Sequence, residues 1–219
     1  MTAPDSPTPR ARRDGDTEQR ILQAARRVFV RRGTAGARMQ EIAEEAGVNQ
    51  ALLHYYFRSK DGLAVAVFRE AAGRLVPSVL SVLASDATLE EKVERFVHLY
   101  IDEVRRHPFI PGYIVSELHH HPERITDLMA DLAGTRPSTF AHPLLLRLRA
   151  QLEAQAAAGT MRPMSPEQFL VNLLALTVFP FVGRPLLLFM LDLDAGGFDR
   201  FLDERRAELP GFILRGMRP

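Results

Sequence analysis

The chain has no cysteine among its 219 residues, which excludes disulfides and thiolate zinc sites. Nothing in the composition therefore indicates an oxidising compartment, and a cytoplasmic location is expected. The N-terminal stretch contains prolines and arginines but lacks the apolar core of a secretory signal. We predict that residues 1–15 form a disordered, weakly basic arm.

Sequence motifs of catalysis are also missing. The chain has no Gly-x-Ser-x-Gly elbow, no phosphate-binding glycine loop and no His-Glu-x-x-His pair. Stray carboxylates and histidines remain, but they have no spacing typical of a catalytic site. The sequence therefore predicts a protein that is not an enzyme and that needs no cofactor.

Sustained alternation of β-branched residues, the signal of a strand, is absent from the chain. Apolar residues instead recur at helical spacing, which predicts an all-α protein of nine or ten helices. We expect a small all-helical head at residues 16–76, whose last helix is kinked or ended by Pro77, and a larger helical body at residues 77–219. The expected helices cover residues 16–33, 39–46, 49–57, 60–76, 88–106, 114–120, 123–132, 140–158, 166–179 and 198–214.

One segment, Phe169 to Leu191, has the length and apolar content at which a membrane span must be considered. Two prolines, Pro180 and Pro185, interrupt it, and so does the charged residue Arg184. Charged residues inside a span are costly. We therefore expect a buried or interface helix here.

The stretch around residues 38–57 has the pattern of two short helices and a tight turn. Met39, Ile42 and Ala46 recur at helical spacing before Gly47, a typical helix-ending residue. Asn49 is a good cap for the next helix, whose inward residue is Leu53. The pattern predicts a helix-turn-helix.

The outer face of the second short helix is small, polar and aromatic. It consists of Gln50, Ala51, His54 and Tyr55, and it has no acidic residue. A helix fits the major groove, where amide and imidazole groups can meet base edges. The alternative is that these residues are exposed parts of a purely stabilising head.

Lys60 lies in the first turn of the next helix, where a cation is mildly unfavourable for the helix dipole. A bound anion such as a DNA phosphate would explain a lysine there. The alternative is a lysine that is simply solvated.

These residues together resemble the DNA-binding head of TetR-type transcriptional regulators, over about Asp16 to Leu75. The likeness is carried by the run from Ile42 to Val48 and by Leu53, Tyr56, Phe57, Ser59, Lys60 and Leu63. The resemblance implies a homodimer that binds a palindromic operator and a body that binds a small-molecule effector. The expected role is repression. The expected DNA-contacting residues are Arg38, Gln40, Asn49, Gln50, Ala51, Leu52, His54, Tyr55, Tyr56 and Lys60.

The chain departs from the family pattern in three places. Arg38 and Met39 stand where many relatives have a threonine, and Leu52 replaces another common threonine. His54 and Tyr55 stand where tyrosine and then histidine are common, so the operator sequence cannot be borrowed from relatives. Arg38 is expected to supply a charge-assisted phosphate contact instead.

The body is expected to pair with its symmetry mate through helices Pro166–Phe179 and Phe198–Leu214, because their apolar faces exceed what one body can hide. Residues that are either core or effector pocket are Phe96, Tyr100, Phe109, Tyr113, His120, Phe140 and Phe179. The run His119 to His121 invites a metal hypothesis, but consecutive helical residues point about 100° apart, so no metal is expected. The alternative function is a small-molecule-binding or membrane-associated helical protein without DNA binding.

Overall fold

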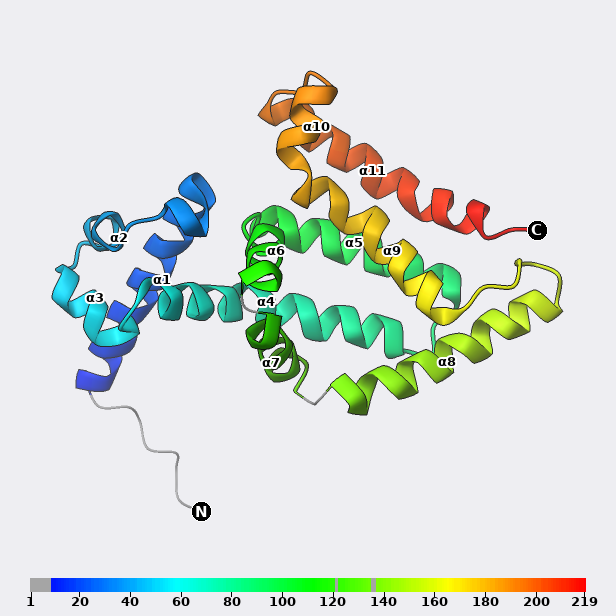
Figure 1. Cartoon of the computed structure of the whole chain (residues 1–219), viewed down its shortest axis with the longest axis horizontal. Coiled ribbons are helices and arrows are strands. Elements are labelled where there is room, and N and C mark those ends of the chain that lie inside the picture. The colour runs from blue at the N-terminus through cyan, green and yellow to red at the C-terminus, as the bar shows by residue number, and fades with distance from the viewer. Residues whose placement is uncertain (1–8, 121, 135–136) are drawn as a thin grey trace, which may run out of the picture. The chain divides into compact units, whose positions relative to one another are not determined.

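The structure, a computed structural model, describes residues 9–120, 122–134 and 137–219 (Figure 1). In these ranges every regular element is a helix, which confirms the all-α prediction. There are eleven helices here, against the nine or ten expected. Their bounds are α1 Pro9–Gly36, α2 Met39–Ala46, α3 Gln50–Phe57, α4 Lys60–Ala84, α5 Leu89–Arg106, α6 Ile110–His120, α7 Pro122–Ala133, α8 Pro137–Ala157, α9 Pro166–Val182, α10 Arg184–Met190 and α11 Ala195–Gly216.

Two compact units divide the chain, Met1–Glu70 and Ala71–Pro219, which we call the head and the body. The division falls inside α4, as does the expected boundary at residue 76. The helix continues through Pro77, so of the two expected effects of this proline, a kink or an end, the end is wrong. Leu75 and Leu83 are buried on either side of the proline. Burial of both flanks offsets the roughly 3 kcal/mol that a proline inside a helix costs.

The head has a small apolar core that α1 supplies in large part. Ile21, Ala25, Val28 and Phe29 form an apolar stripe on α1 that is buried. The helix begins at Pro9, so residues 9–15 are helical and not the disordered arm that we expected. A proline in the first turn followed by arginines and alanine favours a helix, which explains the earlier start.

The body is organised around α5, which begins at a capping box formed by Thr88 and Glu91. Thr88 Oγ1 accepts from the Glu91 backbone N–H at 3.2 Å, and Glu91 Oε2 accepts from the Thr88 N–H at 3.1 Å. The apolar stripe of α5 is buried, and α11 lies along this helix (Figure 1). Arg206 ties the two helices together through two bonds to the Asp102 carboxylate, at 3.0 and 3.1 Å.

The sequence pattern does not predict α10, because the stretch after Pro180 continues the apolar segment of α9 without a change in character. Gly183 ends α9, and Pro185 in the first turn of α10 begins a new helix. Within the described ranges, no single helix is long and apolar enough to cross a membrane. The pair α9 and α10 together has that length and composition but is bent by 72°.

Besides α1, three more helix starts differ from the prediction, and a side-chain cap explains one of them. Helix α11 begins at Ala195 instead of Phe198, because Asp194 Oδ1 accepts from the Gly197 N–H at 2.6 Å and caps it. Helix α6 begins at Ile110 instead of residue 114, with Pro111 tolerated in its first turn. Helix α8 begins at Pro137. A proline therefore lies in the first turn of two of these helices, α6 and α8.

Candidate nucleic-acid interface

The turn between α2 and α3 depends on Gly47. Its backbone is left-handed, with φ 64° and ψ 37°, a conformation that glycine adopts without steric cost. The Val48 N–H donates to the Ala43 carbonyl at 3.0 Å, and the Gly47 N–H donates to the Glu44 carbonyl at 3.1 Å. These two bonds form a Schellman motif that ends α2 and turns the chain into α3.

Helix α3 is capped by Asn49 and anchored by Leu53, as predicted. Asn49 Oδ1 accepts from the Leu52 N–H at 2.7 Å. The Leu53 side chain is fully buried in the head. One polar bond at the start and one apolar anchor in the middle hold this eight-residue helix, which is too short to be stable alone in water.

The outer face of α3 is open. Gln50, Ala51, His54 and Tyr55 are all exposed, and Tyr55 is 78% exposed. Leu52 is half-buried beside them. Because α3 contains no carboxylate, nothing on this helix repels the negative charge of a nucleic acid.

Cationic residues flank the exposed face. Arg38 stands at the start of α2 with an extended backbone, and its exposed side chain forms no capping bond. Arg58 follows α3 directly, is exposed and has φ 56°, an uncommon conformation for a residue other than glycine. The sequence analysis missed Arg58. A cation placed immediately after the outward-facing helix was the signal that could have found it.

Two of the expected backbone-contacting residues have partners inside the head. Lys60 Nζ donates to the Ala35 carbonyl at 2.9 Å, which ties the start of α4 to the end of α1. Gln40 Nε2 donates to Glu44 Oε1 at 3.0 Å, one turn along α2. The position of Lys60 therefore has an internal explanation that the sequence analysis did not foresee, and its phosphate contact stays a prediction.

An aromatic cluster covers the end of α3. The rings of Tyr55 and Tyr56 meet edge to face at 5.3 Å, and those of Tyr56 and Phe57 lie 6.3 Å apart. Tyr56 and Phe57 are both half-buried. The cluster supports Tyr55 from behind while its ring remains in solvent.

An ion-pair network joins α1 to α2 behind the exposed face. Glu45 accepts from Arg27 Nε at 2.8 Å and from Arg31 Nη2 at 2.7 Å. The hydrogen bond from Arg31, followed by the one from Arg27, lowers the pKa of the Glu45 carboxyl. Arg31 also lies 3.7 Å from Glu41. These acids of α2 are thereby neutralised by arginines of α1.

Gly62 allows α4 to begin close to the end of α3. A Cβ at this position would lie 2.5 Å from the Phe57 carbonyl oxygen. Ser59 Oγ accepts from the Gly62 N–H at 3.0 Å in the same turn and caps α4. The glycine is therefore required by the close approach of two backbone segments.

We expect Gly62→Ala to destabilise the protein by about 1–3 kcal/mol, because the added methyl group forces the backbone apart. Gly73→Ala in the same helix is the matched control, since a Cβ there meets nothing within 4 Å. It should be neutral or stabilise by up to about 1 kcal/mol. Urea unfolding followed by circular dichroism measures both variants. A Gly62→Ala protein as stable as Gly73→Ala would contradict this role.

The predicted effector-pocket residues are spread over the body. Phe96 and Tyr100 on α5, like Phe109 and Tyr113, are buried, and burial raises the pKa of the Tyr100 hydroxyl. Phe179 is 53% exposed on α9. The side chains of His120 and Phe140 lie outside the part that the structure describes.

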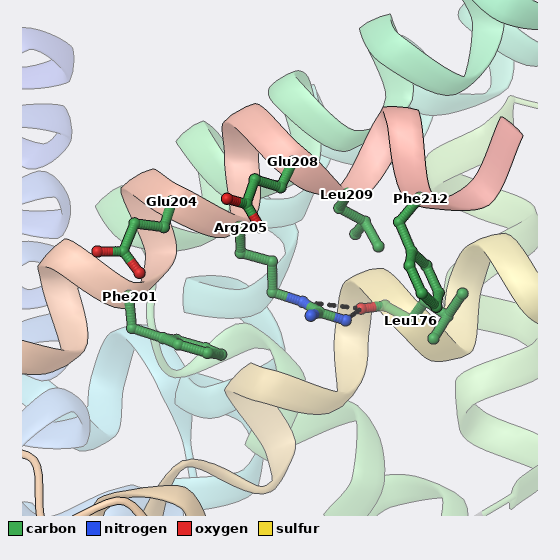
Figure 2. Close-up of a pocket in the computed structure, with 7 residues that line it drawn as sticks. All are labelled: Leu176, Phe201, Glu204, Arg205, Glu208, Leu209 and Phe212. Atoms are coloured by element: carbon green, nitrogen blue, oxygen red, sulfur yellow. Dashed lines mark hydrogen bonds between the residues drawn. The ribbon is translucent and has the colours of Figure 1, made fainter. Parts of the chain in front are cut away.

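A cavity of about 290 Å³ lies between α9 and α11, and none of those predicted residues lines it (Figure 2). Arg205 reaches into it and donates to the Leu176 carbonyl, from Nη2 at 2.6 Å and from Nε at 3.2 Å. Burial lowers the pKa of Arg205. The cavity is lined by Leu176, Phe201, Glu204, Arg205, Glu208, Leu209 and Phe212, none of which the sequence analysis predicted.

In the part of the chain that the structure describes, the run from His119 to His121 forms no metal site. His119 Nδ1 donates to the Val115 carbonyl at 2.9 Å, and His121 lies outside the described residues. Among the residues that were described, no three histidine, aspartate or glutamate side chains come together in a geometry for a metal ion.

A helical head with a glycine turn and an exposed, acid-free second helix defines a helix-turn-helix DNA-binding protein. Comparison with known proteins gives the family. Residues 21–67 match the model of bacterial regulatory proteins of the tetR family. The head of this chain therefore contains a DNA-binding domain similar to that of the tetR family.

The matches between this chain and the two curated relatives described next each cover only part of either protein. The chain is 33% identical over 103 residues to the transcriptional regulator BetI of Rhizobium meliloti (strain 1021), which covers 47% of this chain and 49% of BetI. It is 32% identical over 124 residues to the transcriptional repressor SCO4008 of Streptomyces coelicolor (strain ATCC BAA-471 / A3(2) / M145), covering 55% and 63%. The chain thus spans about half to two thirds of these relatives.

A solved structure extends the likeness of fold to the body. The crystal structure of HlyIIR, a hemolysin II transcriptional regulator, has a TM-score of 0.58 and covers 94% of this chain and 99% of that chain. The sequence identity is 20%, so this likeness concerns the fold alone.

Proposed function

We propose that the protein is a homodimeric repressor that binds a palindromic operator in the cytoplasm and is released by a small-molecule effector. The observation that carries the proposal is the outward face of α3, exposed and free of acid, on a helix anchored by buried Leu53. Repression accords with the relative from Streptomyces coelicolor that is named a repressor. A dimer on an operator blocks polymerase without any further surface.

The apolar surface of the body supports the dimer. Val171, Leu174 and Val182 are exposed along one side of α9, and Phe189 of α10 is 85% exposed. Contiguous exposed apolar residues mark interaction surfaces, and most homo-oligomers are two-fold symmetric. The segments Pro166–Phe179 and Phe198–Leu214 are the proposed interface, with Phe212 exposed on the second of them.

The effector is proposed to bind in the body and to shift the population between two spacings of the heads. Only the spacing that matches successive major grooves, about 34 Å apart, binds the operator tightly. The buried aromatics of α5 and α6 are the proposed apolar walls of that site, while the cavity that the structure describes lies between α9 and α11. Tyr100, for example, stacks on Phe96 with ring centres 6.1 Å apart.

Selection of bound fragments from random duplex DNA tests the proposal, because it reports binding, symmetry and operator sequence at once. With the selected operator, we expect Gln50→Ala to relax base preference, since an amide can bond bidentately to adenine. Arg38→Ala should weaken binding to all duplexes alike and lower the salt slope by about one. Salt titrations on matched and scrambled duplexes measure both. Two variants with the same profile would refute the division of roles.

A further inference from the structure

We propose that His54 recognises the operator as a hydrogen-bond acceptor, through Nε2, and that its partner is the exocyclic amino group of an adenine or a cytosine. The proposal rests on the proposed function, since it concerns the face of α3 that would enter the major groove. It names the chemical group that this side chain selects.

The tautomer of His54 follows from its neighbour. His54 Nδ1 lies 3.0 Å from the Arg58 carbonyl oxygen. A carbonyl oxygen only accepts, so the ring must supply the hydrogen from Nδ1. In the neutral imidazole the other nitrogen, Nε2, then has a free lone pair and no hydrogen.

The backbone at the end of α3 holds the Arg58 carbonyl in place. Arg58 has φ 56° and ψ −42°, and its N–H donates to the His54 carbonyl at 2.9 Å. Two bonds therefore link the same pair of residues, one through the backbone and one through the ring. The ring is exposed, and the structure gives Nε2 no partner among the residues it describes.

Only two groups in the major groove can donate to an acceptor at Nε2. They are the N6 amino group of adenine and the N4 amino group of cytosine, whereas guanine and thymine present only acceptors there. Gln50 on the same face has both a donor and an acceptor and fits adenine at two atoms. His54 therefore selects a base with an amino group, adenine or cytosine, whereas Gln50 selects adenine.

The test uses base analogues in the operator selected by the wild-type protein, at about pH 8, where an imidazole is neutral. A parallel selection with His54→Ala identifies the base pair whose preference depends on His54. At that pair, adenine is replaced by purine or cytosine by 2-pyrimidinone, each of which lacks only the amino group. The matched controls are 7-deazaadenine or 7-deazaguanine, which lack the acceptor N7 and keep the amino group of the pair.

Loss of the amino group should weaken DNA binding of both proteins, but the fold-loss should be about five times larger for the wild type than for His54→Ala. That difference corresponds to one hydrogen bond. The comparison between the two proteins removes the effect of weaker base pairing. The 7-deaza bases should affect both proteins equally. A loss that follows N7 instead, or a selection that is identical for both proteins, overturns the proposal while leaving DNA binding intact. If neither protein selects any duplex, the proposed function itself fails.

Discussion

Replacing Leu174 by aspartate should dissociate the proposed dimer and weaken operator binding by a factor on the order of 10² to 10⁴. Leu174 is 44% exposed on the apolar side of α9, between Val171 and Val182. In a dimer the second head binds as if at very high local concentration, and a monomer loses that advantage. A carboxylate buried in an apolar interface has no partner and is strongly disfavoured.

The matched control is Leu146→Asp on α8. Leu146 is also an exposed leucine, 52% accessible, but it lies outside the segments proposed to pair. Sedimentation velocity at micromolar concentration should show a monomer for Leu174→Asp and a dimer for both Leu146→Asp and the wild type. A dimer that persists in Leu174→Asp, with unchanged operator affinity, would place the interface elsewhere.

Leu53→Ala is expected to cost about 2–5 kcal/mol of stability in the head, because it removes a buried leucine from a small core and leaves a cavity. Leu53 has no solvent exposure and is the apolar anchor of α3. Its loss should free α3 from the head and abolish specific operator binding. The body, which does not use this contact, should stay folded.

Hydrogen exchange followed by mass spectrometry separates these effects by region. Peptides covering residues 39–57 should exchange roughly 30-fold faster or more, and peptides covering residues 89–106 should not change. Val30→Ala is the control, since Val30 is 50% exposed on α1 of the same unit. It should change stability by no more than about 0.5 kcal/mol. Equal protection of α3 in the two variants would show that Leu53 does not anchor it.

The departures from the family pattern acquire a physical interpretation. Arg38 stands at the start of α2 without a side-chain cap, so α2 begins without the hydroxyl that many relatives have there. The helix is held at its other end by the Schellman motif at Gly47 and along its side by Arg27 and Arg31 on Glu45. The arginine is therefore left available for a phosphate.

The sequence by itself determined the helical class and the helix-turn-helix. The cap at Asn49, the turn at Gly47 and the capping box at Thr88 are each made by residues within five positions of one another, so their chemistry is visible in the sequence. The inward placement of Leu53 follows from helical spacing alone. The exposed face of α3 follows in turn, because it is what remains when Leu53 points inward.

Only the tertiary structure decided the features that join distant segments. Lys60 meets the Ala35 carbonyl across 25 positions of sequence, and Arg205 meets the Leu176 carbonyl across 29. The cavity between α9 and α11 has the same origin. The continuation of α4 through Pro77 also depended on burial of both its flanks. Such contacts arise from packing, whose free energy outweighs local propensity and leaves no periodic signal in the chain.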